Sequence, residues 1–161
     1  MTRAQFTSYV ETTQRPLRRF LVALCCGDGA LADDIAQDTY VKAYLASDTF
    51  RDDAAFFTWI HKIAYNTYLS YKRSNRRTES LDGSAETTAV ETADATFRYQ
   101  ALYEGLGRLS DKERNAILLH YLEGYAVKEI ADMTDASQDA VRQQLSRGRV
   151  HLKCLLNSSS L

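Results

Sequence analysis

The chain has 161 residues, of which 45% are hydrophobic and 25% are charged, and its formal net charge is −1. This composition is ordinary for a folded domain, and no apolar run approaches the roughly 20 residues that a membrane-spanning helix needs. Met1–Val10 carries no secretory signal and the three cysteines follow no framework spacing, so we expect a cytoplasmic protein with reduced thiols.

Helices are favoured along the whole chain, because only one proline and seven glycines interrupt it. We therefore predict an all-α fold of two small helical domains joined by a flexible acidic linker. In the first domain, residues 1–77, helices are expected over about 2–14, 17–26, 32–47 and 55–76. Pro16 is expected in the first turn of the second helix, where its missing N–H costs nothing.

The helix expected over 32–47 has two distinct faces at helical spacing. One is suited to the core and carries Ile35, Ala36, Tyr40, Ala43 and Tyr44. The other begins acidic and ends apolar, and carries Asp34, Gln37, Asp38, Val41 and Leu45. Periodicity alone leaves two interpretations of this second face open: a partly buried packing side, or a docking surface for a basic partner helix.

The helix expected over 55–76 combines an apolar line with a basic stripe. The apolar line is Phe56, Ile60, Ala64, Thr67 and Tyr71, and the stripe is Lys62, Asn66, Arg73 and Arg77, flanked by Tyr65, Leu69 and Arg76. Cations suit the phosphates of a nucleic-acid strand, and aromatic rings suit unstacked bases. A plain solvated face is the alternative, although no acid occurs between Ala54 and Thr78.

The segment 78–96 is rich in Ser, Thr, Ala and acid and has no apolar periodicity, which predicts a linker. The net charge of −1 hides a pattern of +3 over residues 1–77, −5 over 78–97 and +1 over 98–161. Because the local field decides how a protein binds a polyanion, the near-neutral total does not exclude nucleic acid.

The second domain, residues 97–161, reads as a helix-turn-helix. A helix over 97–108 is followed by a capping box, Ser110 to Glu113, and by a helix that should end at Gly124. A short helix over 127–133 and a polar turn over 134–137 lead into a final helix. In this motif the last helix enters the major groove of DNA.

The final helix has an inner and an outer line. The inner line is Val141, Leu145, Gly148 and Leu152, and the outer line is Gln138, Arg142, Gln143, Ser146 and Arg149, with Arg147 beside it. Gln and Arg form bidentate contacts with adenine and guanine edges. Asp139, near this surface, would either favour a cytosine amino group or repel phosphate. A plain helical hairpin is the alternative interpretation.

Four sequence runs together resemble the extracytoplasmic-function (ECF) group of bacterial sigma factors, over nearly all of the chain. They are ADDIAQDTYVKAYLA at 32–46, FFTWIHKIAYNTYLSYKR at 56–73, LSDKERNAILLHYLEGYAVKEIADM at 109–133 and AVRQQLSRGRVHL at 140–152. The resemblance implies that residues 1–77 form sigma region 2 and residues 97–161 form sigma region 4. It implies a factor that binds core RNA polymerase, recognises and melts promoter DNA, and directs initiation.

The resemblance also implies residue roles. It assigns binding to the clamp helices of the largest subunit of core polymerase to Asp34, Gln37, Asp38 and Val41. Contacts near the minus-ten element fall to Trp59, Lys62, Tyr65, Asn66 and Arg73, and the loop 48–54 would hold a flipped-out base. Contacts with the minus-thirty-five element fall to Gln138, Arg142, Gln143, Ser146 and Arg147.

Further partners implied by the resemblance are the polymerase flap and an anti-sigma factor, which could hold the protein at the inner membrane. No cofactor, metal or small-molecule substrate is expected, and the absence of a nucleophile–base pair or a phosphate loop argues against an enzyme. The alternative is a stand-alone helix-turn-helix regulator. The turn Thr134-Asp135-Ala136 departs from the family's usual Leu-Gly-Ile, so the minus-thirty-five sequence cannot be transferred by analogy.

Overall fold

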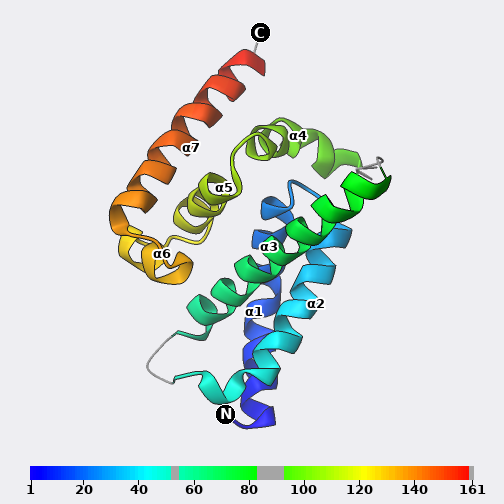
Figure 1. Cartoon of the computed structure of the whole chain (residues 1–161), viewed down its shortest axis with the longest axis vertical. Helices are drawn as coiled ribbons and strands as arrows, with labels where there is room; N and C mark the ends of the chain where they lie inside the picture. The colour runs from blue at the N-terminus through cyan, green and yellow to red at the C-terminus, as the bar shows by residue number, and fades with distance from the viewer. Residues whose placement is uncertain (52–54, 83–92, 160–161) are drawn as a thin grey trace. The chain divides into compact units, whose positions relative to one another are not determined.

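A computed structural model of the chain describes residues 1–51, 55–82 and 93–159, with side chains described outside 77–98 and 158–159 (Figure 1). The helices are α1 (Arg3–Leu24), α2 (Gly29–Leu45), the short 3₁₀ helix η1 (Ser47–Thr49), α3 (Phe56–Asp82), α4 (Ala93–Gly107), α5 (Asp111–Ile117), the π-helical η2 (Leu118–Leu122), α6 (Val127–Thr134) and α7 (Gln138–Ser159). The described residues contain no strand, and the all-α prediction is confirmed. No helix in these ranges is long and apolar enough to cross a membrane.

The chain divides into two compact units. The first comprises Met1–Leu21 and Ala30–Thr88, and the second comprises Val22–Gly29 and Ala89–Leu161. Helices extend into both ends of the segment expected as a linker, since α3 continues to Asp82 and α4 begins at Ala93. The remainder of that segment, residues 83–92, lies outside the described residues.

The two helices expected over 2–14 and 17–26 form one continuous helix, α1, with Pro16 in its interior. An interior proline removes one backbone hydrogen bond and costs about 3 kcal/mol. The helix continues because its packing face runs straight through this position. That face is Thr13, Leu17, Phe20, Leu21 and Leu24, all buried at helical spacing. Burial on both sides of Pro16 therefore outweighs the local penalty.

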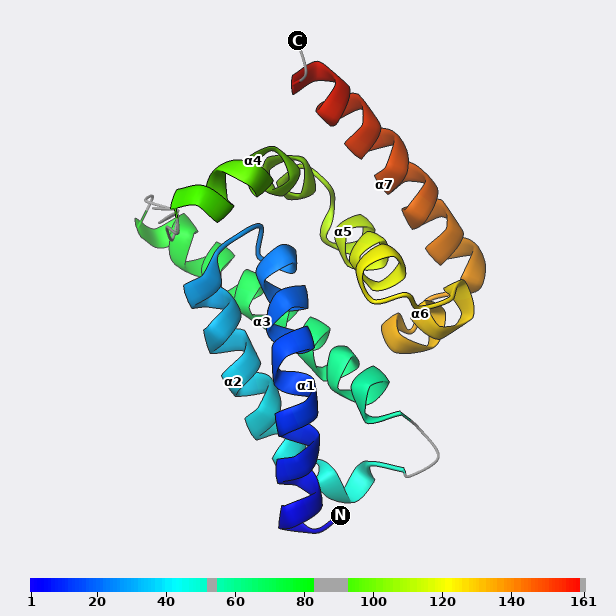
Figure 2. The same ribbon diagram turned by 180° about the vertical axis from the view of Figure 1, so that it is seen from behind.

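In the first unit α1, α2 and α3 lie side by side, as both views show (Figure 2). The hydroxyls of Thr13 and Tyr40 are 2.8 Å apart and join α1 to α2. The ring of Phe20 lies edge-on to His61, at 4.7 Å between centroids, and joins α1 to α3. The fully buried Ile35 and Ile60 belong to the apolar core among these helices.

In the second unit, helix α5 begins at the Ser110 cap expected from the sequence. Ser110 Oγ accepts a hydrogen bond from the backbone N–H of Glu113 at 3.2 Å. The helix that starts there was expected to be a single α-helix, but it changes to π-helical geometry at Leu118. Gly124, with φ of +78°, follows its end as predicted, because glycine adopts this left-handed conformation without strain.

Asp135 forms the turn of the helix-turn-helix in a left-handed conformation, with φ of 55° and ψ of 34°. Aspartate tolerates this region better than most residues, which explains how the turn forms without the usual glycine. Ser137 Oγ then accepts from the backbone N–H of Ala140 at 3.0 Å and caps α7. Val141, Leu145 and Gly148 are buried on the inner side of α7, as their spacing predicts.

Candidate functional site

The second face of α2 is exposed in the structure. Val41 exposes 51% and Leu45 exposes 77% of its surface, while Asp34 and Gln37 are exposed and Asp38 is half-buried. Apart from Asp38, the face therefore does not pack within the first unit. It presents an acidic half followed by an apolar half, an arrangement suited to a partner that brings both cations and apolar surface.

Asp38 is held by α3. The hydroxyl of Tyr71 hydrogen-bonds to Asp38, and the pKa of Tyr71 is raised by desolvation, then by the charge of Asp38 and this bond, and by the charge of Asp34. One turn along, Lys42 Nζ donates to Thr67 Oγ1 at 3.3 Å. Asp38 lies opposite Tyr71, and Lys42 lies opposite Thr67. The helices α2 and α3 therefore run antiparallel. Tyr71 was expected in the core, but it is only half-buried because it contacts this exposed face.

The basic stripe of α3 is only partly available at the surface. Asn66 and Arg73 are exposed, and Lys62 is half-buried. Arg73 Nη2 donates to Ser70 Oγ at 3.3 Å, which holds the guanidinium close to its own helix. Tyr65 is 8% exposed, and its ring stacks with that of Tyr68 at 6.3 Å. As it stands, Tyr65 offers no free ring face to a base.

Trp59 belongs to a packed aromatic cluster at one end of the first unit. Its ring is 5.1 Å from that of Phe50 and 5.6 Å from that of Phe56. Phe56 in turn stacks on Tyr9 of α1 at 4.4 Å. The sequence interpretation did not group these rings, because they are far apart in the chain. The loop expected to hold a flipped base begins beside this cluster, but its residues 52–54 lie outside the described part of the chain.

The outer line of α7 is exposed over its whole length, at Gln138, Arg142, Gln143, Ser146, Arg147 and Arg149. Arg142 Nη1 donates to Asp139 Oδ1 at 2.9 Å, and Arg142 Nη2 donates to Gln138 Oε1 at 3.4 Å. Arg149 Nη1 donates to the hydroxyl of Tyr121 at 3.0 Å. The sequence placed the α7 side chains on one face, but the hydrogen bonds that they make could not be read from it.

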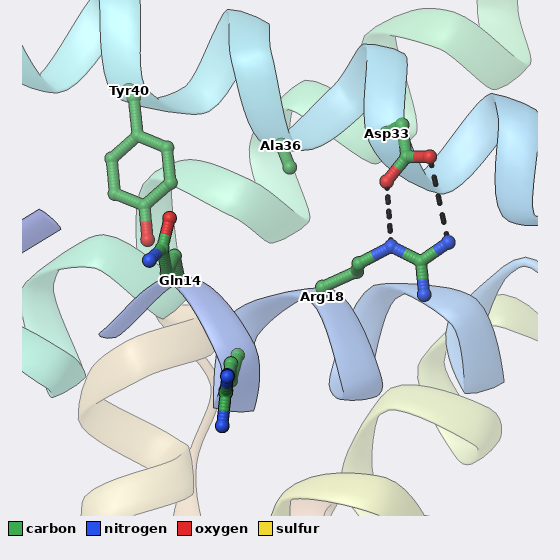
Figure 3. A pocket seen from close by; sticks show the side chains of 6 residues that line it. Gln14, Arg18, Asp33, Ala36 and Tyr40 are labelled. Carbon is green, nitrogen blue, oxygen red and sulfur yellow. Dashed lines mark hydrogen bonds and ion pairs between the residues drawn. The ribbon is translucent and has the colours of Figure 1, made fainter. Parts of the chain in front are cut away.

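A pocket of about 340 Å³ lies between α1 and α2 and is lined by Gln14, Arg15, Arg18, Asp33, Ala36 and Tyr40 (Figure 3). Arg18 Nε donates to Asp33 Oδ1 at 2.8 Å at one end, and Tyr40 and Gln14 lie at the other. No pattern in the sequence singled out this pocket. Its one ion pair is exposed on both sides, so it contributes little to stability. No group of three His, Cys, Asp or Glu that could hold a metal occurs among the residues that the structure describes.

Comparison with known proteins finds two family matches. Residues 9–78 match sigma-70 region 2, and residues 99–152 match sigma-70 region 4. The chain is 33% identical over 131 residues to the ECF RNA polymerase sigma-E factors of Salmonella typhimurium strain LT2 and Escherichia coli strain K12, covering 72% of this chain and 69% of those proteins.

Solved structures are similar over nearly the whole chain. The sigma factor RpoE of Bartonella quintana, solved with the anti-sigma factor NepR, aligns with a TM-score of 0.84 and 26% identity over 95% of this chain and 97% of that one. CnrH, solved with the cytosolic domain of CnrY, aligns with a TM-score of 0.75 and 23% identity over 98% and 90% of the two chains, and supports the fold alone.

Proposed function

This chain belongs to the ECF sigma factors, and from that premise we propose how its exposed surfaces share the work of such a factor. As a sigma factor, the protein directs transcription initiation by RNA polymerase, and the family acts by binding rather than by catalysis. The proposal is that α2 docks on core polymerase, that α3 contacts the minus-ten element, and that α7 reads the minus-thirty-five element.

The observation that carries the docking proposal is the exposure of Val41 and Leu45 on a helix whose buried residues are Ala32, Ile35, Thr39 and Ala43. Burial of a whole aliphatic side chain releases about 1.5–3 kcal/mol, and the exposed parts of Val41 and Leu45 would contribute in proportion to their area. Asp34, Gln37 and Asp38 lie on the same face and would pair with cations and polar groups of that partner. The clamp helices of the polymerase's largest subunit are the partner expected for a sigma factor, and the flap would take the second unit.

For the minus-ten element we propose that Lys62, Asn66 and Arg73 contact the DNA directly. All three lie on one side of α3, and two of them are exposed. Trp59 and Tyr65, which were expected among the DNA contacts, are packed against other rings. Their role in this proposal is to hold α3 and the start of the adjacent loop in place, and Tyr65 reaches a base only if its packing opens.

For the minus-thirty-five element we propose major-groove contacts by the outer line of α7. Gln138, Arg142, Gln143, Ser146 and Arg147 are exposed there, and Gln and Arg carry the donors that base edges recognise. Two weak DNA surfaces on one chain become effective when polymerase fixes their separation, since the second contact is then intramolecular. The isolated protein should therefore bind promoter duplex weakly.

We further propose that the protein works in the cytoplasm, where its polymerase and promoters are, and that an anti-sigma factor regulates it. The support for the regulator is that the similar sigma factor RpoE of Bartonella quintana was solved with an anti-sigma factor. The stand-alone helix-turn-helix regulator is the weaker account, because it leaves the exposed face of α2 without a purpose.

The docking proposal is tested by co-elution with bacterial core RNA polymerase on a sizing column. We expect a stable complex with the unchanged protein and a much weaker one with Leu45→Asp, because the variant puts a charge into the apolar half of the face. Thr12→Asp is the matched control, since Thr12 is exposed on α1 in the same unit and away from this face. Equal complex formation by Leu45→Asp and Thr12→Asp would refute the proposed docking face.

A further inference from the structure

We infer that Asp139 is a positioning residue for promoter recognition: together with Gln138, it holds the guanidinium of Arg142 in the orientation that reads a guanine. The inference rests on the proposed function of α7 and deepens it by naming the base and the residue that sets the preference. The three residues lie within the first turns of α7, on its exposed outer face.

The guanidinium of Arg142 is held at two of its nitrogens. Nη1 donates to Asp139 Oδ1 at 2.9 Å, and Nη2 donates to Gln138 Oε1 at 3.4 Å. Both partners precede Arg142 on the same helix, three and four residues away, so the contacts follow from helix geometry. The arginine side chain is 59% exposed and that of Asp139 is 90% exposed, so the held group still faces outward.

An arginine carries five N–H donors in a planar fork, so these two contacts leave three of them free. Two parallel donors match guanine, which presents the O6 and N7 acceptors side by side in the major groove, whereas adenine presents one acceptor and one donor. A tethered guanidinium also loses less side-chain entropy when it binds the base. The arrangement therefore favours guanine over the other bases.

A carboxylate on a DNA-facing surface also acts against indiscriminate binding, because it repels phosphate. Asp139 is the last acid of the chain, and every charged residue after it is a cation or a histidine. Without Asp139, Arg142 would be free to swing to the phosphate backbone, which carries no sequence information. Asp139 should thus raise selectivity while lowering affinity for DNA in general.

The competing explanation is that Asp139 stabilises α7, because an acid in the first turn of a helix interacts favourably with the helix dipole. The two roles predict opposite changes. Loss of a stabilising acid lowers binding to every promoter, whereas loss of a positioning acid lowers selectivity and raises binding to poor promoters.

The experiment uses the complete chain assembled with bacterial core RNA polymerase and a promoter library whose minus-thirty-five positions are randomised. Each promoter variant carries its own barcode in the transcribed region, and the barcodes of the transcripts are sequenced to give the preference at each position for the unchanged protein, Asp139→Ala, Asp139→Asn and Arg142→Ala. Asp132→Asn is the matched control, because Asp132 is an exposed acid on α6 of the same unit. Thermal unfolding of every variant checks that the second unit stays folded.

We expect one position at which guanine is preferred by the unchanged protein and at which Arg142→Ala abolishes the preference. Asp139→Ala should weaken the preference for guanine at that same position about three- to tenfold and raise transcription from non-preferred sequences, while Asp132→Asn leaves the preference unchanged. If Arg142→Ala alters a position but both Asp139 variants keep its full preference, the positioning role is wrong and the reading role of α7 stands. If Arg142→Ala alters no position, both are wrong.

Discussion

Gly148 on α7 and Ile117 on α5 approach so closely that a Cβ atom at position 148 would lie 2.7 Å from Ile117 Cγ1. No real Cβ makes so short a contact, so glycine is required for the two helices to meet at this distance. The consequence concerns α7 as a whole, because this contact and the buried Val141 and Leu145 fix which side of α7 faces outward.

Gly148→Ala should therefore destabilise the second unit. Inserting a methyl group into a well-packed contact typically costs about 1–3 kcal/mol, which exceeds the gain in helix propensity. We expect a lower midpoint of thermal unfolding by circular dichroism. Val150→Ala is the control, since Val150 is exposed on the same helix and its truncation should leave the midpoint nearly unchanged. An unchanged midpoint in Gly148→Ala would mean that Ile117 can move aside without cost.

Arg114→Met should destabilise the second unit more strongly. The buried Arg114 donates through Nε to the carbonyl of Leu106 at 2.7 Å and through Nη2 to the carbonyl of Leu109 at 3.0 Å, at the C-terminal end of α4. Removing the guanidinium takes a charged donor away from both carbonyls, at about 1.5–3 kcal/mol for each lost bond, although the carbonyl of Leu106 keeps the N–H of Leu109 at 3.2 Å. We expect a loss of roughly 3 kcal/mol in unfolding free energy. Arg108→Met, at an exposed position, should lose almost nothing.

His61 should make the first unit less stable in acid. Burial lowers the pKa of His61 from 6.5 to about 4, and its hydrogen bond to the carbonyl of Phe57 opposes that shift. The unfolded chain binds a proton below about pH 6.5 and the folded chain only below about 4, so stability is lost as the pH falls through this window. At about 1.4 kcal/mol for each tenfold change in proton affinity, the full loss is about 3 kcal/mol.

The measurement is urea unfolding at pH 7 and pH 5, followed by the fluorescence of Trp59, the only tryptophan of the chain and a residue of the same unit. His61→Gln removes the titrating ring, and its unfolding free energy should fall less between these two pH values than that of the unchanged protein. Identical falls in the two proteins would show that other groups account for the acid sensitivity.

Tyr71→Phe should weaken binding to core polymerase without unfolding the protein. The variant keeps the ring and removes the hydroxyl that hydrogen-bonds to Asp38, so the carboxylate loses its fixed position on the docking face. An unheld carboxylate must be ordered again when it meets the partner, at about 0.5–1.5 kcal/mol for one side chain, so we expect a complex roughly two- to tenfold weaker. Tyr99→Phe, on α4, is the control and should bind as before. The affinities can be compared by titrating labelled polymerase.

The surfaces of α2 and α7 could be predicted because both depend on helical periodicity alone. The spacing of Val41 and Leu45 placed them together, and the structure leaves both exposed. The turn at Asp135 was also predictable, because aspartate is one of the few residues that tolerate a left-handed conformation. Periodicity reports which residues share a face, and that was enough to define the fold class and the outer lines of the helices.

Contacts between distant segments could not be predicted in this way. Pro16 was expected at a helix start, and only the buried face on both sides of it explains why α1 continues. The spacing of Tyr65 placed it beside the basic stripe, but its ring is buried against Tyr68. The change to π-helical geometry at Leu118 could not be seen in the sequence, because residues 113–119 are all buried and show no one-sided spacing that a shift would interrupt.

The contacts of Lys42 with Thr67 and of Asp38 with Tyr71 connect α2 to α3. They therefore also provide a route by which force can pass from one helix to the other. If α2 binds polymerase and α3 binds the promoter as proposed, both forces act on the same pair of helices. A force on the DNA as its strands separate would then reach the polymerase through the contacts between α2 and α3. The two helices would move together. If the contacts between them were lost, they should slide past one another and transmit less of that force.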